Sequence, residues 1–304
     1  MRSENFGLIK NASQMFTKDE TLEMFKNFCT IHYFELEVKK AYDSGLMYMP
    51  IYLGLGQEAI ASSLAVVLKK KSPSIFAQHR AHGTYIAFGG DLKKLIDELL
   101  HRESGCAKGM GGSASIHEPN IKMYGHDGLM GTQVPIGVGY SMSKNYQTEK
   151  KEYSLIFMGD ASAEEDYVLG ALGYAAHKKL PILFVCEDNN FSILTEVKVR
   201  RNWKMTDLAR SFGMESADIC DDPWTIMYNA KRLSTSLPAF LNIHTARAGW
   251  HAGTGSDGPP EWDRFMLIKN EIEKIGLAEE ATKIEEQVKK EVREIWEVQL
   301  AVKQ

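Results

Sequence analysis

Asp160 and Asn189 are the two residues whose types and spacing point to metal chemistry. Asp160 follows the apolar run SLIFMG, residues 154–159, and Asn189 follows the run PILFVCED, residues 181–188. A helical pattern lies between the runs, which indicates a strand–helix–strand unit of a parallel sheet. The right-handed crossover of such a unit can place both strand ends side by side at the edge where ligands bind.

A carboxylate and an amide oxygen side by side are hard ligands suited to Mg²⁺ or Ca²⁺. Magnesium often fills its remaining positions with phosphate oxygens, and a helix beginning near Ala163 offers free backbone N–H groups to the same phosphates. We therefore expect a metal-bridged diphosphate. The alternative is a strand-end aspartate that only caps the helix, but a cap does not need the second oxygen ligand offered by EDNN at residues 187–190.

Three more acids, Glu164, Glu165 and Asp166, follow Asp160 within six residues. We interpret them as first-turn residues that favour the positive end of the next helix, and not as further ligands. An acid beside a diphosphate is electrostatically unfavourable unless it points away or meets a base.

The elements that must position these residues alternate along the chain. Helices are expected at residues 19–44, with Thr17 as N-cap, and at 56–71, 91–102, 163–179, 204–212 and 223–235. A short strand leading to a loop is expected at 74–83, and further strands at 154–160, 181–188, 215–220 and 239–247. Glycine-rich loops occupy 105–135 and 248–260, and loops this long in a compact domain are usually functional or disordered. The fold class is α/β, a parallel sheet flanked by helices.

Composition sets outer limits on the function. The 304 residues are 44% hydrophobic, which is ample for a sizeable core, and 40 acids against 36 bases give a net charge of −4. That charge gives no reason to expect nucleic acid as a partner. Four scattered cysteines read as reduced thiols of a cytoplasmic protein. We find neither a signal-peptide pattern nor an apolar run of membrane-spanning length, so no membrane span is expected.

The chain is expected to have three parts: an N-terminal arm at 1–18, the main domain at 19–260 and C-terminal helices at 261–304. The last part carries an apolar stripe of Ile284, Val288, Val292 and Ile295, at helical spacing. That stripe must cover a surface, either of its own domain or of a partner subunit.

Several stretches resemble a known family. GDA at 159–161 with EDNN at 187–190 is similar to the thiamine diphosphate motif. Other segments resemble, in family order, the alpha subunit of the decarboxylating component of 2-oxo acid dehydrogenases: GQEA at 56–59, HRAHG at 79–83, GCAKGMGGS at 105–113, GLMGTQVPIGVG at 128–139 and KLPILFVCEDNNFSI at 179–193. The resemblance covers roughly residues 50–260 and implies the thiamine diphosphate-binding fold of the diphosphate type.

The resemblance implies a set of cofactor ligands. Mg²⁺ would be held by Asp160, Asn189 and the backbone carbonyl of Phe191. The backbones of Gly159, Ala161 and Ser162 and the guanidinium of Arg80 would contact the diphosphate. Gly128 and Met130 would contact the aminopyrimidine through main-chain atoms. Ile193 would support the cofactor in its bent form. Without the resemblance, Arg80 would read as a surface arginine and Ile193 as ordinary core.

Histidines are the catalytic candidates that the resemblance implies. His251 matches the mobile active-site histidine, which stabilises intermediates and assists acyl transfer, although a lone loop histidine is usually only solvated. His82 and His79 flank Arg80 and are expected to line the pocket; His82 matches the family, and His79 stands where tyrosine is frequent.

Five positions depart from the family pattern. Ala161 replaces a glycine, Glu164 an asparagine, Asp166 a glycine and Met110 a frequent lysine, while Ala252 follows the loop histidine where mitochondrial relatives carry a regulatory serine. Alanine at 161 is tolerable unless the residue needs a positive φ. Ala252 excludes phosphorylation at that position.

The resemblance also implies partners. A beta subunit would supply the pyrimidine-binding domain and the activating glutamate in an α2β2 assembly, and a lipoyl acyltransferase would accept the acyl group of a small 2-oxo acid after decarboxylation. Two alternatives remain open at this point: a biosynthetic transferase that passes the acyl or aldehyde unit to a sugar or amine, and a non-catalytic subunit that keeps the fold. Ala161, Glu164 and Asp166 favour the last; Asp160 and His251 oppose it.

We predict that Asp160→Ala abolishes Mg²⁺-dependent cofactor binding, because it removes a metal ligand, whereas Glu165→Gln leaves binding nearly intact. Titration of thiamine diphosphate in the presence of Mg²⁺ checks both variants. Equal losses of affinity in the two variants would show that the assignment of Asp160 as a metal ligand and of Glu165 as a helix-turn acid is wrong.

Overall fold

The computed structural model describes residues 4–125, 128–147, 152–253 and 259–302. Within them a parallel sheet of six strands forms the centre of the molecule, in the order β2-β1-β3-β4-β8-β7. The strands are β1 (Ser74–Phe76), β2 (Met123–Tyr124), β3 (Ser154–Gly159), β4 (Ile182–Asp188), β7 (Glu215–Cys220) and β8 (Ala239–His244). This confirms the α/β class and the strand–helix–strand unit formed by β3 and β4.

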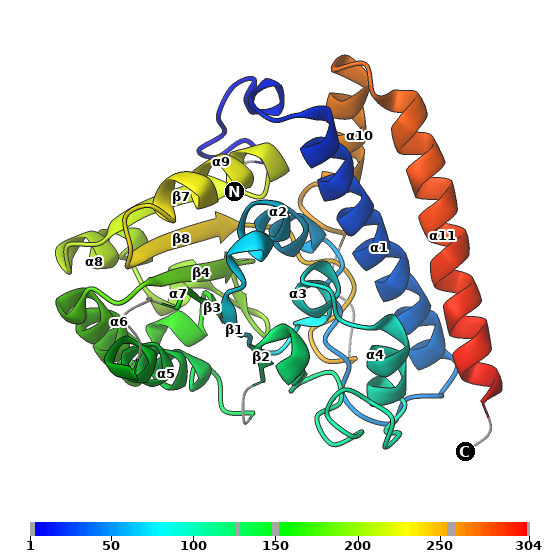
Figure 1. The fold of residues 1–304 in the computed structure, drawn as a ribbon, viewed down its shortest axis with the longest axis horizontal. Coiled ribbons are helices and arrows are strands. Elements are labelled where there is room, and N and C mark those ends of the chain that lie inside the picture. Colours follow the sequence, from blue (N-terminus) through cyan, green and yellow to red (C-terminus); the bar gives the residue numbers. More distant parts are fainter. Residues whose placement is uncertain (1–3, 126–127, 148–151, 254–258, 303–304) are drawn as a thin grey trace.

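Helices cover both faces of the sheet, as Figure 1 shows. One face packs against α5 (Gln133–Gln147), α6 (Asp166–Lys178) and α8 (Met205–Ser211); the other packs against α2 (Glu58–Leu68), α3 (His82–Ala87) and α9 (Pro223–Leu233). In β4 the side chains of Leu183 and Val185 enter one core and those of Phe184 and Cys186 the other. Burial on both faces explains why the strand reads as a continuous apolar run.

The strand order reverses next to β1. Its neighbours are β2 on one side and β3 on the other, and the chain then continues from β3 to β4. Connections that leave in opposite directions open a crevice at the carboxyl ends of such strands, which is where open α/β sheets bind ligands.

An outer layer of helices lies beside α2 and α3 (Figure 1). The long helix α1 (Lys18–Asp43) follows its N-cap residue Thr17, whose side chain forms the expected cap together with Glu20. α10 (Arg264–Lys274) leads into α11 (Ala278–Ala301), which packs along α1. Val288 and Val292 are buried in this contact. The C-terminal stripe therefore covers its own domain.

The described part of the N-terminal segment runs against the edge strand β7. The carbonyl of Phe6 accepts the backbone N–H of Cys220, and the N–H of Ile9 donates to the Thr225 hydroxyl at 3.1 Å. A single 3-10 turn, η1 (Ala12–Met15), follows before Thr17.

Short elements account for most differences from the expected pattern. Helix α3 stands where a loop was expected, and α5 and β2 begin within or just after the first glycine-rich loop. All six residues of α3 are buried, so the segment has no polar face to reveal a helical period. The remaining short elements are α4 (Leu92–Leu99), η2 (Lys69–Lys71), η3 (Pro119–Ile121), η4 (Ser162–Glu164), β5 (Phe191–Ser192), β6 (Thr195–Glu196) and α7 (Val197–Arg200).

The first glycine-rich loop is organised by one buried carboxylate. Glu98, at the end of α4, accepts four backbone N–H groups, from Ala107, Gly109, Gly111 and Gly112, at 2.7–3.0 Å. An ionised carboxylate can accept this many donors, and each bond to a charged acceptor is stronger than a neutral one. The loop is thus tied to α4.

A cluster of one histidine and two aspartates, the His244 cluster, joins strands β4, β7 and β8. His244, the last residue of β8, lies 3.2 Å from Asp188 of β4 and 2.7 Å from Asp218 of β7. Burial alone would lower the pKa of His244, but the two aspartates outweigh it and raise the pKa from 6.5 to about 9.

In the part of the chain that the structure describes, no helix is both long and apolar enough to cross a membrane.

We expect Trp296→Ala to lower the free energy of unfolding by about 3–5 kcal/mol, the usual cost of deleting a buried tryptophan. Trp296 is 1% exposed and packs on Phe34 of α1 with ring centroids 5.5 Å apart. The matched control is Val298→Ala on the same helix, where the side chain is 57% exposed and the expected change is under about 0.5 kcal/mol. Urea denaturation measures both; similar values would show that α11 does not stabilise the domain.

The His244 cluster predicts a pH-dependent stability. Because the folded-state pKa lies above the unfolded value, the contribution is fully present below about pH 6.5 and is lost as pH rises through about 9. The difference in the free energy of unfolding between the wild type and His244→Asn should therefore be largest near pH 6.5 and should shrink as the pH approaches 9. Urea midpoints at both ends of this window test it; a constant difference would contradict the assigned ion pairs.

Candidate active site

A cavity of about 350 Å³ opens at the carboxyl ends of β1, β3, β4 and β8. Most of the residues expected at the cofactor line it, together with side chains that the sequence did not single out. The predicted residues in its wall are His79, Arg80, Gly128, Met130, Gly159, Asp160, Ala161, Ser162, Asn189, Phe191, Ile193 and His251; Tyr52, Gln57, Gln78, Glu165, Glu187, Ser192 and Arg247 complete it.

Asp160 and Asn189 lie at neighbouring strand ends of this cavity, as expected. Gly159 pairs with Glu187 in the β3–β4 register, so the segments that follow these two strands leave the sheet side by side. The Asn189 amide donates from Nδ2 to Gln57 Oε1 at 2.8 Å and accepts the N–H of Phe191 at Oδ1 at 3.1 Å. This fixes the amide orientation. A carboxylate, an amide oxygen and the nearby backbone carbonyl of Phe191 form a donor set that fits Mg²⁺.

Two arginines meet the acids at the end of β3. Arg200 donates from Nη2 to Asp160, from Nε to Glu164 at 3.3 Å and from Nη1 to the carbonyl of Thr195. Arg201 Nη1 reaches the carbonyl of Asp160 at 3.4 Å, and its Nε lies 3.5 Å from Glu164.

This arrangement corrects the interpretation of the three acids as helix-turn residues. Glu164 belongs to the 3-10 turn η4 and not to α6, which begins only at Asp166. Its side chain forms an ion pair with Arg200. Glu165 is the N-cap residue, but its side chain makes no capping hydrogen bond and instead lines the cavity. Asp166 alone behaves as expected: it lies in the first turn and accepts the N–H of Tyr167 at 2.7 Å.

The loop after β3 is tight but unstrained. Ser162 accepts the N–H of Gly159 at its hydroxyl oxygen, 2.9 Å away. Ala161 has φ −81° and ψ −44°, in the right-handed region. The replacement of the family glycine by alanine therefore carries no backbone penalty.

The hairpin β5–β6 forms the outer wall of the cavity. Its turn residue Ile193 has φ +53° and is 58% exposed, so it is not ordinary core. Arg247, which sequence reasoning did not assign to the site, donates to the Ile193 carbonyl at 2.7 Å and lies over the Phe191 ring at 5.5 Å. A β-branched residue rarely adopts a positive φ, and this contact holds it there.

Arg80 is a buried wall residue and not a surface arginine. It is 7% exposed and has φ +65°. Its guanidinium donates to the carbonyls of Leu53 and, at 3.3 Å, of His251. It therefore links the loop before α2 to the loop that carries the histidine.

Three aromatic rings gather in the wall of the cavity. Tyr52, His79 and His251 form edge-to-face contacts with centroids 4.8–5.9 Å apart. Arg247 Nη1 lies 3.4 Å from Nδ1 of His251. The sequence offered no pattern that would single out Tyr52, because its neighbours in the cluster lie 27 and 199 positions away.

His82 does not line the cavity, which corrects its expected role. The side chain is fully buried, with Nδ1 3.0 Å from Glu35 and Nε2 2.9 Å from the Ser113 hydroxyl. Ser113 in turn accepts the N–H of Tyr52 at 2.9 Å. His82 therefore supports the loop that carries Tyr52 from behind the cavity wall.

Gly128 and Met130 reach the cavity from the segment before α5. Gly128 has φ +95° with open space around it, and the carbonyl of Met130 accepts the Tyr167 hydroxyl. Their expected contact with the aminopyrimidine stays a prediction.

Glu187 is a titratable group in the cavity wall. Burial raises its pKa from 4.5 to about 7, although Gln78 donates to it at 3.3 Å and Arg80 lies nearby. It is the second-last residue of β4, which ends at Asp188, and Asn189 follows the strand.

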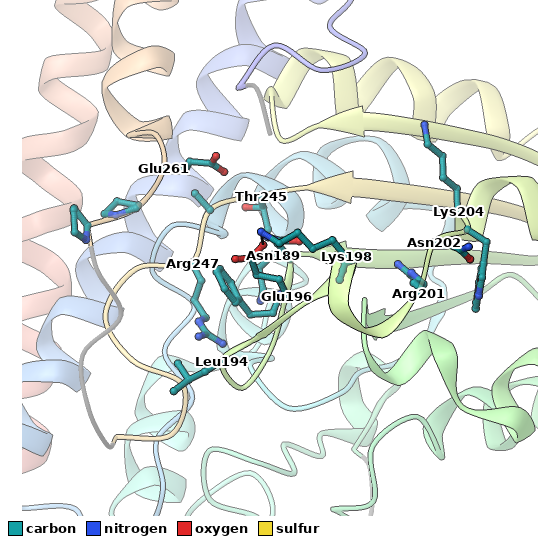
Figure 2. A pocket seen from close by; sticks show the side chains of 17 residues that line it. Asn189, Leu194, Glu196, Lys198, Arg201, Asn202, Lys204, Thr245, Arg247 and Glu261 are labelled. Carbon is teal, nitrogen blue, oxygen red and sulfur yellow. Dashed lines mark hydrogen bonds and ion pairs between the residues drawn. The ribbon is translucent and has the colours of Figure 1, made fainter. Parts of the chain in front are cut away.

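A larger cleft of about 890 Å³ adjoins the cavity and shares Asn189, Phe191 and Arg247 with it. Figure 2 shows Asn189 and Arg247 on one side of this cleft and Arg201 and Lys204 on the other. The segment after the hairpin is thus one wall of the cleft, while its arginines reach back to the end of β3.

Comparisons with known proteins identify the family of this chain. The family model described as dehydrogenase E1 component matches residues 28–301. The pyruvate dehydrogenase E1 component subunit alpha of Rickettsia felis is 30% identical, with 91% of this chain and 90% of that protein covered. The corresponding protein of Rickettsia prowazekii is 31% identical over 77% of this chain and 74% of its own. Rice has a mitochondrial relative, subunit alpha-1, that is 28% identical over 78% of this chain and 61% of its own.

Among solved structures, a transketolase of Pichia stipitis has a TM-score of 0.56 at 15% identity. It is matched over 92% of this chain, which spans about half (46%) of the transketolase chain. A likeness at this identity shows the shared fold alone. The family match and the two rickettsial relatives show more: the chain belongs to the dehydrogenase E1 component family, as an alpha subunit of a thiamine diphosphate-dependent 2-oxo acid dehydrogenase.

Proposed function

We propose that this chain binds thiamine diphosphate through Mg²⁺ and, together with a beta subunit, decarboxylates a small 2-oxo acid. The observation that carries the proposal is that one cavity is lined both by the oxygen ligands Asp160 and Asn189 and by a ring cluster with His251. A metal-bridged diphosphate needs the oxygen ligands, and the chemistry on the substrate needs the histidine of the ring cluster.

The chain's own residues would hold the cofactor from several elements. Asp160, Asn189 and the carbonyl of Phe191 would ligate Mg²⁺, and the backbone of Ala161 and Ser162 would approach the diphosphate. Arg80 supports this role because its buried guanidinium already lies in the cavity wall. Ile193, whose backbone carbonyl accepts from Arg247, would support the bent cofactor.

Bound thiamine diphosphate supplies the carbanion that adds to the keto carbon and the electron sink that lets carbon dioxide leave. The protein must orient the 2-oxo acid and manage protons around it. The Arg247 guanidinium next to Nδ1 of His251 favours the neutral tautomer with its proton on Nε2. From there the proton can be donated to the keto oxygen, with Tyr52 and His79 packed around the imidazole.

A beta subunit would complete the site. The activating glutamate of this chemistry belongs to a pyrimidine-binding domain, and we propose that the partner supplies it in an α2β2 assembly. The exposed apolar side chains of Ile193, Leu194 and Leu129 around the cavity region support a protein contact there. Several relatives are themselves named subunit alpha.

We further propose a lipoyl acyltransferase as the acceptor of the acyl group. The expected docking loop, residues 248–260, lies only partly within the described residues. The names of the relatives favour a dehydrogenase over the biosynthetic transferase and over a non-catalytic subunit. Free cysteines, three of them buried, are consistent with the proposed cytoplasmic location.

We predict that the chain alone is inactive and that co-purification with its beta subunit gives 2-oxo acid-dependent reduction of an artificial electron acceptor. His251→Ala should lower the turnover rate about 100-fold or more, because a positioned proton donor contributes that much. Chelation of Mg²⁺ should abolish cofactor binding, measured by calorimetry.

Replacing the artificial acceptor with a lipoyl domain tests the acceptor. Reductive acylation of that domain is the expected result. Activity with the artificial acceptor but none with lipoyl domains would favour the transferase alternative, and failure of the two-subunit complex to bind thiamine diphosphate would overturn both enzymatic readings.

A further inference from the structure

Glu164 places a negative charge beside the loop where a diphosphate is proposed to bind. Coulomb repulsion between a carboxylate and a phosphate grows as the surroundings become less polar, and Asp160 next to it is almost fully buried, with 2% of its side chain exposed. An unpaired acid at position 164 would therefore weaken diphosphate binding.

The structure pairs this acid with arginine. Arg200 forms ion pairs with the carboxylates of Asp160 and Glu164, while Arg201 forms one with Glu164 and reaches the backbone carbonyl of Asp160. The arginine side chains are 13% and 4% exposed. The charges of the two arginines cancel those of the two acids. Arg200 uses all its nitrogens: Nη2 on Asp160, Nε on Glu164 and Nη1 on the carbonyl of Thr195.

We propose that Arg200 is a diphosphate-binding residue and that Glu164 is the residue that positions it. This rests on the proposed function, because it takes Asp160 as the metal ligand. When Asp160 turns to the metal, the contacts with Glu164 and Thr195 keep the guanidinium in place. Its Nη2, which also lies 3.2 Å from Glu164, then has one N–H available for a phosphate oxygen, for which arginine geometry is well suited.

The proposal predicts a change of sign between two genetic backgrounds. In the wild type, Glu164→Gln should weaken binding of thiamine diphosphate, about threefold or more, because Arg200 loses its anchor. In an Arg200→Gln background the same change should tighten binding, because it now removes an acid that has lost one of its two arginine partners and keeps only the longer contact with Arg201. Arg200→Gln itself should weaken binding about tenfold to 100-fold, the usual range for a hydrogen bond to a charged group.

The experiment is a calorimetric titration of thiamine diphosphate at saturating Mg²⁺, on the complex of this chain with its beta subunit. Four proteins are compared: wild type, Glu164→Gln, Arg200→Gln and the double variant. Arg200→Lys is a fifth, which keeps the charge but loses the planar fork and should give an intermediate affinity. If Arg200→Gln does not fold, a sixth protein that combines Arg200→Lys with Glu164→Gln replaces the double variant. Binding by this protein should be weaker than binding by Arg200→Lys alone.

Asp207→Asn provides the matched control. Asp207 forms an exposed pair with Arg210 on α8, with Nη1 and Oδ1 2.7 Å apart, and its loss should leave the dissociation constant unchanged. Thermal unfolding without cofactor checks that all variants fold.

Tighter binding of Glu164→Gln in both backgrounds would overturn the proposal, because Glu164 would then be only a repulsive acid. Unchanged affinity of Arg200→Gln would overturn it as well. If the wild-type complex shows no Mg²⁺-dependent binding at all, the proposed function fails and the inference with it; binding by the wild type without the change of sign rejects the inference alone.

Discussion

The parallel pairing of β3 with β4 is the constraint on which the site depends. It sets Gly159 opposite Glu187, so that Asp160 and Asn189 leave the sheet together. No local feature could bring them together, because 29 positions separate them along the chain. The reversal of strand order beside β1 then opens the crevice in front of them, and the loops carrying Arg80, Ile193 and His251 close around it.

Acids accumulate at this edge of the sheet, and each is balanced in its own way. Glu164 forms ion pairs with two arginines, and His244 forms ion pairs with both Asp188 and Asp218. Glu187 instead has a pKa raised to about 7 by burial. Compensation of this kind lets the protein concentrate oxygen ligands for a cation without leaving buried charges unpaired.

Buried carboxylates also organise loops that have little secondary structure. Glu98 collects four N–H groups of the first glycine-rich loop, while Glu35 accepts from Gly54 and contacts His82. Loop backbone needs such acceptors, because unpaired buried N–H groups are costly. These contacts hold the loops near the cavity on rigid supports, with α1 and α11 forming the outer layer of the domain.

The sequence by itself determined the α/β class, the start of α1 at Thr17, the limits of β7 and the two strand ends that carry Asp160 and Asn189. These follow from local periodicity and from motifs of fixed spacing. Only the tertiary structure decided that His82 supports a loop from behind the cavity wall, that Arg247 holds Ile193, and that Glu164 pairs with Arg200. The physical reason is that a side chain's partner depends on which segments the fold brings together. Short buried elements such as α3 have no polar face, so their sequence pattern does not predict where they lie in the fold.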